Sequence, residues 1–509
     1  MAKSDALGEI TKAYAFDGPA IELGAAVVDN AAHPDARIRV PLSMLNRHGL
    51  VAGATGTGKT KTLQLMAEQL SAAGVPVFLA DIKGDVSGMA APGAPSDRVA
   101  TRSKDVGDDW VPAAYPVEFL SIGGVGKGTS VRAAISSFGP QLLAKVLDAN
   151  EVQESSLGLV FHYADKAGLP LLDLKDLRAV IQYLVSDEGE AELKDLGGLS
   201  KATAGVLLRD LIGLEDQGAD VFFGEPELDT ADLLRVLPDG RGVVSVLGLR
   251  DLQDRPKVFS TFLMWLLADL FHDLPEVGDV DKPKLVFFFD EAHLLFDDAS
   301  EAFLDAIAQT VRLIRSKGVG VFFVTQTPKD VPGDVLAQLG NRIQHALRAF
   351  TPDDAKKLKA TVSTFPKSDV YDLGELLTSM GIGEAAVTIL NERGAPTPVA
   401  WTRLRAPRSL MAEADPALVD SLVASSPLRP KYAEMLDRES AYEKLAGKLA
   451  APEGDDEPTA EDKPKEKKKG GLLAGIFGSS AFRSFARSAA TVAGREITRG
   501  VLGTGRRRR

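Results

Sequence analysis

A run of glycine, threonine and lysine residues near position 55 has the types and spacing needed to hold phosphate. The run is Gly53-Ala54-Thr55-Gly56-Thr57-Gly58-Lys59-Thr60, followed by Lys61, and it fits G-x-x-x-x-G-K-[ST] in full. Its glycines let the backbone curl so that N–H groups point toward phosphate oxygens. Lys59 adds a mobile positive charge, and the Thr60 hydroxyl can ligate Mg²⁺. The run, Lys61 included, predicts binding of ATP with Mg²⁺; the alternative is a turn that holds a lysine by chance.

Two adjacent carboxylates follow an apolar run in the second half of the chain. Residues 285–289 read Leu-Val-Phe-Phe-Phe, and Asp290 and Glu291 come directly after them. Asp290 could hold Mg²⁺ through its waters, while Glu291 could polarise an attacking water molecule. The alternative is that Asp290 only caps a helix over Ala292–Phe296. Together with the glycine-rich run, the two acids predict hydrolysis of ATP.

Two further apolar runs end in polar residues. Gln326 follows Val319–Val324, where it could sense the γ-phosphate or position water, or could simply begin a loop. Asp81 and Asp85 lie in the turn after Val75–Ala80. They could act near the nucleotide or a partner, because this end of a parallel strand faces the ligand crevice, or they could be solvated charges around Gly84.

Several arginines could supply charge to a neighbouring subunit's ATP. Hydrolysis leaves negative charge on the γ-phosphoryl group, which a guanidinium can stabilise. Arg342 is our first choice and Arg315 the second, with Arg312 and Arg348 as further candidates. The alternative for each is an ordinary surface arginine.

The elements that must position these groups are apolar runs that alternate with helical segments. Continuous apolar strands separated by helices are typical of a parallel sheet covered on both faces. The expected strands are Gly49–Ala52, Val75–Ala80, Val117–Ile122, Val243–Leu249, Leu285–Phe289 and Val319–Val324. A helix is expected over Lys61–Leu70, directly after the glycine-rich run.

Composition and patterning divide the chain into six parts. We expect a small β-rich region over residues 1–45, an α/β nucleotide core over 46–126 and 236–405, a helical insertion over 127–235, a helical C-terminal extension over 406–450, a charged linker over 451–470 and a basic amphipathic tail over 471–509.

The last part is strongly basic in a chain that is acidic as a whole. Residues 471–509 hold eight arginines and one glutamate, a net charge of +7, against −12 for all 509 residues. Arg483/Arg487 and Arg495/Arg499 are spaced four apart, as on a basic amphipathic helix. Such a helix would bind anionic lipid, nucleic acid or an acidic partner; the alternative is a disordered solubilising tail.

The composition of the whole chain excludes several kinds of site and surface. The chain has no cysteine, so disulfides and thiolate metal sites are excluded. The net charge excludes a uniformly basic DNA-coating surface, although not basic groups gathered on one inner face. No secretory signal is visible at the start of the chain, so we expect a cytoplasmic protein, with peripheral attachment to the inner membrane face as a further option.

Residues 45–405 resemble the HerA/FtsK group of RecA-like P-loop ATPases, and the bacterial HerA-helicase-like proteins most of all. The resemblance rests on the glycine-rich run, Asp81-Ile82-Lys83-Gly84-Asp85, Phe289-Asp290-Glu291-Ala292-His293 and Thr325-Gln326-Thr327-Pro328. Leu339-Gly340-Asn341-Arg342 is similar to the place where this group carries its trans-acting arginine.

The resemblance implies a RecA-like fold, a homo-hexameric ring and ATP-driven movement on double-stranded DNA. Two other functions stay open. One is an ATP-driven module that acts on a protein or at a membrane, with the basic tail as its anchor. The other is a nucleotide switch with little turnover, against which Glu291 argues because a switch has less need of a water-activating carboxylate.

Overall fold

The computed structural model describes residues 3–193, 197–278, 280–297 and 299–450. The expected charged linker (451–470) and basic tail (471–509) lie outside the described residues. The chain divides into two compact units. The first contains Met1–Glu154 and Ile212–Leu436, and the second contains Ser155–Leu211 with the described part of Asp437–Arg509.

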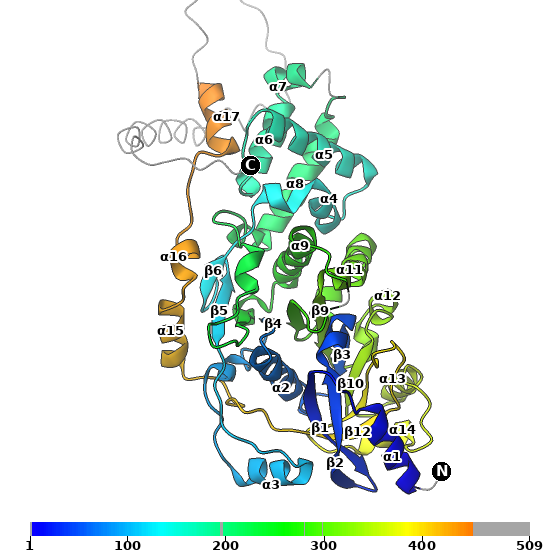
Figure 1. Ribbon diagram of the computed structural model, residues 1–509. Helices are drawn as coiled ribbons and strands as arrows, with labels where there is room; N and C mark the ends of the chain where they lie inside the picture. Colours follow the sequence, from blue (N-terminus) through cyan, green and yellow to red (C-terminus); the bar gives the residue numbers. More distant parts are fainter. Residues whose placement is uncertain (1–2, 194–196, 279, 298, 451–509) are drawn as a thin grey trace, which may run out of the picture. The chain divides into compact units, whose positions relative to one another are not determined.

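A twelve-stranded sheet forms the centre of the first unit. All neighbouring strands from β10 to β6 are parallel, and those from β2 to β10 are antiparallel (Figure 1). In sheet order the strands are β2 (Ala31–Pro41), β1 (Ala20–Val28), β12 (Ala400–Leu404), β11 (Glu384–Thr388), β10 (Asn341–His345), β3 (Gly49–Ala52), β9 (Val319–Thr325), β8 (Leu285–Phe289), β4 (Val77–Asp81), β7 (Val244–Gly248), β5 (Val117–Ile122) and β6 (Thr129–Val131).

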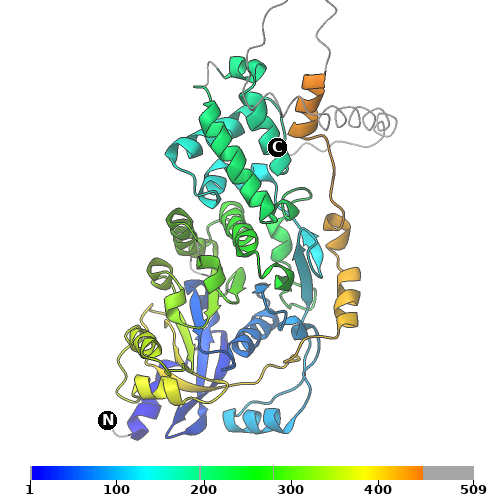
Figure 2. The ribbon, with the colours of Figure 1, turned by 180° about the vertical axis from the view of Figure 1, so that it is seen from behind.

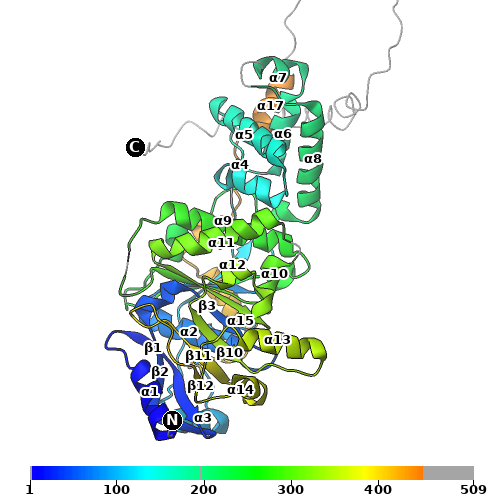
Figure 3. The same cartoon turned by 90° about the vertical axis from the view of Figure 1, so that its right-hand side faces the viewer.

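Helices connect these strands, and Figure 3 shows α9 and α11 together on one side of the sheet. The α-helices that begin and end in this unit are α1 (Lys3–Ala13), α2 (Lys59–Ala72), α3 (Asp97–Val106), α4 (Ile135–Val146), α9 (Pro256–Asp273), α10 (His293–Phe296), α11 (Glu301–Ile314), α12 (Gly333–Leu336), α13 (Pro352–Val362), α14 (Leu373–Ser379), α15 (Pro416–Ala424) and α16 (Arg429–Tyr432).

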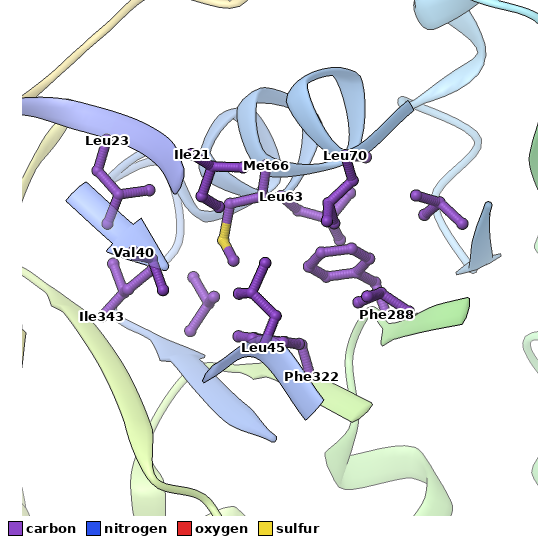
Figure 4. Packing of buried hydrophobic residues seen from close by; sticks show 14 of the residues in the cluster. Ile21, Leu23, Val40, Leu45, Leu63, Met66, Leu70, Phe288, Phe322 and Ile343 are labelled. Atoms are coloured by element: carbon purple, nitrogen blue, oxygen red, sulfur yellow. The ribbon is translucent and has the colours of Figure 1, made fainter. Parts of the chain in front are cut away.

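Both faces of the parallel strands are buried, as predicted. Successive side chains of a strand point to opposite faces. Phe288 and Phe322 therefore pack in one cluster with Leu63 and Met66 of α2 (Figure 4). On the other face, Phe323 packs against Phe289 and against Phe296 of α10. This two-sided burial explains why these strands are continuous apolar runs in the sequence.

The N-terminal region is β-rich, as expected; its strands β1 and β2 are antiparallel and are part of the main sheet. β1 pairs with β12, with Gly24 opposite Leu404. Elements that were not predicted from the sequence include helix α1 in the first 45 residues, strand β11, and strand β6 within the stretch expected to be helical.

The second unit is helical. It contains α6 (Leu174–Leu184), α7 (Asp187–Glu192) and α17 (Ala441–Ala450), while α5 (Glu151–Lys166) and α8 (Lys201–Asp216) each run across a boundary between the units. Asp176 of α6 accepts a hydrogen bond from the Tyr442 backbone N–H (2.9 Å), which holds α17 against α6. The expected insertion, 127–235, is thus wider than the unit's own segment, Ser155–Leu211. Among the described residues, no helix is long and apolar enough to span a bilayer.

Candidate nucleotide-binding site

The glycine-rich run forms the loop between β3 and α2, at the carboxyl edge of the parallel strands. The ends of the two flanking strands hold this loop in place. The Gly53 N–H donates to the carbonyls of Thr325 and Gln326 (3.2 Å each), at the end of β9, and the Ala54 N–H donates to the Ala346 carbonyl (2.9 Å), after β10. α2 then begins at Lys59 and directs its N-terminal N–H groups toward the loop.

Gly53 is required at its position for two reasons. Its φ is +154°, and an added Cβ would lie 2.4 Å from the Cβ of His345. His345 is fully buried, and its Nε2 lies 2.9 Å from the Thr62 hydroxyl. Burial, with Lys59 adding to the effect, lowers the pKa of His345 to about 4, so the imidazole is neutral at pH 7. Nothing in the sequence pointed to this histidine, because only the pairing of β10 with β3 places it under the loop.

Lys59 is buried beneath the loop, and its ammonium donates to the Gly53 carbonyl (2.7 Å) and the Ala54 carbonyl (3.3 Å). Burial lowers the pKa of Lys59, while the nearby carboxylates of Glu291 and Asp290 oppose this effect. The ammonium therefore lies between the phosphate loop and the two acids predicted to act with it.

Thr60 and Lys61, the next two residues of α2, are half-buried. Burial also lowers the pKa of Lys61, with Asp85 and Asp81 opposing it.

The paired acids lie at the end of β8, one strand away from β3 across β9. Asp290 is 4% exposed, and its Oδ1 accepts the Glu291 N–H (3.0 Å). It does not cap the next helix, because α10 begins after Ala292 without a side-chain cap, so the capping alternative is wrong. Burial, together with the carboxylates of Glu291, Asp81 and Asp85, raises the pKa of Asp290 to about 7, although Lys83 opposes the rise.

A group of carboxylates surrounds Asp290. One oxygen from each of Asp81, Asp85 and Asp290 lies within 4.8 Å of the others, and the buried Oδ2 of Asp290 has no hydrogen-bond partner in the part of the chain that the structure describes. Asp81 is 2% exposed, so it is not a solvated turn residue. Oxygen donors of this kind suit a hard divalent cation. These residues, with Thr60 at the start of α2, fit Mg²⁺.

Glu291 has an unusual backbone conformation and lies beside Lys83 and His293. Its φ is +47°, a region that residues with a side chain seldom adopt. The Ala292 N–H donates to the Val324 carbonyl of β9 (2.8 Å), which fixes the chain just after it. One carboxylate oxygen forms an ion pair with Lys83, and the other lies 3.3 Å from Nδ1 of His293.

Gln326 directly follows β9, and its exposed side chain is at the same edge as the loop. The segment after it is held by Asp330, whose carboxylate accepts from the Thr325 hydroxyl (2.7 Å) and the Thr327 N–H (2.8 Å). Asp330 also opposes the lowering of the Lys59 pKa, and nothing in the sequence had singled it out.

Arg342 and Arg315, the two arginines that we chose first, do not lie at the phosphate loop of their own chain. Arg342 is at the beginning of β10, opposite Leu50, and donates to the Thr364 carbonyl (3.3 Å). Arg315 ends α11 and lies near His48, at the amino end of β3. Arg348 is the candidate that reaches the loop, with Nη2 3.5 Å from the Thr55 carbonyl.

The phosphate loop after β3 and the paired acids after β8 lie at one sheet edge, on either side of β9. This arrangement defines a P-loop protein of the RecA-like fold. The solved structures that resemble this chain agree. The plasmid coupling protein TrwB, in complex with ADP and Mg²⁺, superposes with a TM-score of 0.53 at 17% identity, over 81% of this chain and 94% of that one. The unbound form of TrwB gives a TM-score of 0.52 at 16% identity, with the same coverage.

The chain belongs to the HerA-like helicase C-terminal family, whose model matches residues 27–509. Two archaeal relatives are described as DNA double-strand break repair helicases HerA. The protein of Saccharolobus solfataricus is 20% identical over 74% of this chain and 68% of its own length. That of Sulfolobus acidocaldarius is 20% identical over 69% of this chain and 64% of its own length. The chain thus spans about two thirds of the length of these relatives.

Proposed function

We propose that this protein hydrolyses ATP at the edge formed by β3, β9 and β8. One observation carries the proposal: the buried Lys59, after β3, and the buried pair Asp290 and Glu291, after β8, lie at the same edge of the sheet with only β9 between their strands. A site that only bound nucleotide would not need a buried pair of acids opposite the lysine, because burying such charges is costly.

Each residue then has a role. The N–H groups of residues 53–60 and the Lys59 ammonium bind the β- and γ-phosphates. Thr60 and Asp290 would hold Mg²⁺, which neutralises phosphate charge when bound. Glu291 accepts a proton from water as the water oxygen attacks the γ-phosphorus and ADP leaves. Gln326 orients that water or contacts the γ-phosphate.

Substitution of Glu291 by Gln tests the proposal. The amide keeps the size of the side chain but cannot act as a base, so turnover should fall at least ~100-fold while ATP binding remains. Release of phosphate and binding of a fluorescent ATP analogue would be measured on the same sample. Near-normal turnover in this variant would refute the role of Glu291.

We further propose that the protein is a ring-forming motor on double-stranded DNA.

 

The support is family membership and the DNA helicases among the relatives. The proposed assembly is a homo-hexamer in which Arg342 or Arg315 serves the ATP of the next subunit. ATPase rate and sedimentation should be measured together, with and without duplex DNA. We expect an oligomer whose turnover rises with DNA, and whose DNA binding falls steeply with salt. Unchanged turnover in an assembled oligomer would overturn the DNA motor and leave the ATPase standing.

The net charge of +7 over residues 471–509 favours a second candidate, an ATP-driven module at an anionic membrane or on an acidic protein partner. It predicts turnover that is independent of DNA, and sedimentation with anionic vesicles that is lost when residues 471–509 are removed. Vesicle binding that survives this deletion would count against it.

A further inference from the structure

The turn that follows β4 places a lysine against the proposed catalytic glutamate. β4 and β8 are parallel neighbours, with Ala80 opposite Phe289, so the residues after each strand lie side by side. The Lys83 ammonium forms an ion pair with Oε1 of Glu291. The side chain of Lys83 is 40% exposed, whereas that of Glu291 is 8% exposed. The pair therefore joins a buried carboxylate to a cation that solvent can reach.

Hydrogen bonds within this turn hold Lys83 in place. The Asp81 carboxylate accepts the N–H groups of Gly84 (2.8 Å) and Val86 (3.3 Å), so the backbone on the C-terminal side of Lys83 is fixed. Gly84 has a φ of +80°, which permits the tight reversal.

This arrangement has a consequence for catalysis. A carboxylate that accepts a proton from water needs an available oxygen, and a bound ammonium occupies one. The second oxygen of Glu291 lies beside His293. While the Lys83–Glu291 pair is intact, Oε1 of Glu291 is therefore unavailable to the attacking water.

A polyanion could draw Lys83 away. Arg250, at the end of the neighbouring strand β7, lies beside Gly84, so two cations occur together at this edge. Arg250 is 60% exposed and faces Glu413 at 3.4 Å. Exposed ion pairs of this kind are weak and are screened by salt. A phosphodiester backbone, which carries regularly spaced charges, can compete for both side chains.

We propose that the Lys83–Glu291 pair restrains ATP hydrolysis, and that duplex DNA relieves this restraint by taking Lys83 onto a backbone phosphate. The proposal rests on the proposed ATPase and gives it a means of regulation. Lys83 is a positioning residue, since it acts through Glu291.

The test compares three variants of the full chain with the wild type. Lys83→Ala removes the ammonium and Lys83→Arg keeps a cation. Lys356→Ala is the matched control, because it breaks an exposed Lys–Asp pair on α13. Steady-state kcat and KM for ATP would be measured with and without saturating duplex DNA.

Without DNA, Lys83→Ala should raise kcat about threefold or more, the ratio expected when a partly exposed ion pair is lost, with KM unchanged. DNA should stimulate this variant little, because the restraint is already absent. Lys83→Arg and Lys356→Ala should behave as the wild type does. The proposal is overturned if Lys83→Ala turns over no faster than the wild type without DNA, or is stimulated by DNA to the same extent.

Glu291→Gln separates this result from a failure of the proposed function. Suppose that the wild type hydrolyses ATP, that Glu291→Gln abolishes turnover, and that Lys83→Ala does not raise turnover above the wild-type rate. In that case only the restraint by Lys83 is wrong. If the wild type and Glu291→Gln are equally inactive, the ATPase itself is wrong.

Discussion

At the scale of single residues, the phosphate loop depends on a close approach between two backbones. Gly53 lies over His345 with no space for a side chain, whereas an added Cβ at Gly56 would meet nothing within 4 Å. Both glycines have a positive φ, so both resist substitution through backbone strain. Only Gly53 adds a collision with a buried neighbour.

Gly53→Ala should therefore destabilise the protein more than Gly56→Ala. We expect an additional loss of about 1–3 kcal/mol, the usual cost of overpacking a buried position. Chemical denaturation of the two variants measures the difference. Equal stability would mean that the loop moves aside at no cost.

Lys59 is the residue on which triphosphate affinity should depend most. Lys59→Ala removes a buried ammonium that can turn from the loop carbonyls to the phosphates, so tight ATP binding should be lost. Titration with a fluorescent ATP analogue measures this, and Lys356→Ala provides an exposed lysine control. A Lys59→Ala variant that retains wild-type affinity would exclude this loop as the principal phosphate site.

At the scale of elements, the segment after β12 is fastened to the phosphate-loop helix. Residues 405–415 run beside α2 on their way to α15 (Figure 2). The buried Glu68 of α2 accepts the N–H groups of Arg408 (2.7 Å) and Ser409 (3.1 Å), and Gln64 donates to the Ser409 hydroxyl (2.7 Å). α2 is thus connected to the C-terminal extension as well as to the loop.

Glu68 should make stability depend on pH. Burial raises the pKa of Glu68 to about 7 from 4.5, despite the hydrogen bonds that oppose this. Between these values the folded state binds more protons than the unfolded state, so the contribution of Glu68 is present below pH 4.5 and is lost as the pH rises toward 7. The loss is on the order of 3 kcal/mol.

Glu68→Gln should therefore flatten the change in unfolding free energy between pH 4.5 and 7, while Glu413→Gln, at an exposed site, should not. The measurement is denaturant unfolding at a series of pH values. A slope that is the same in the wild type and Glu68→Gln would show that Glu68 is ionised in the folded protein.

The elements that could be predicted from the sequence are those in which consecutive apolar residues indicate burial. β3 and β8 have the predicted bounds because each is a continuous apolar run, and β5 has them although Glu118 and Ser121 interrupt its apolar residues. β11, Glu384–Thr388, was missed because its short, alanine-containing sequence has weak strand preference and is held by β10 and β12 on either side. The phosphate loop and paired acids could be found because their chemistry lies in adjacent residues. The role of His345 and the ion pair between Lys83 and Glu291 could not be found in this way, because each depends on strands that only the fold brings together.

At the scale of the whole molecule, the positions of Arg342 and Arg315 away from their own loop suit a role in a neighbouring subunit. Arg342→Ala and Glu291→Gln should each be inactive alone if Arg342 serves the next subunit. Mixed oligomers should regain part of the turnover, because an intact Glu291 then meets an intact Arg342 at some interfaces. Mixing the two variants and measuring phosphate release tests this; no recovery after confirmed subunit exchange would assign Arg342 to its own subunit.

The junction between β1 and β12 affects how the chain can be shortened. The family match begins at residue 27, within β1, yet β1 supplies the partner of β12 and carries β2 beside it. A protein cut to that boundary would leave the unpaired amides and carbonyls of β12 open to strands from other copies. Such a shortened protein should self-associate through this edge, and its aggregates could be mistaken for a functional ring.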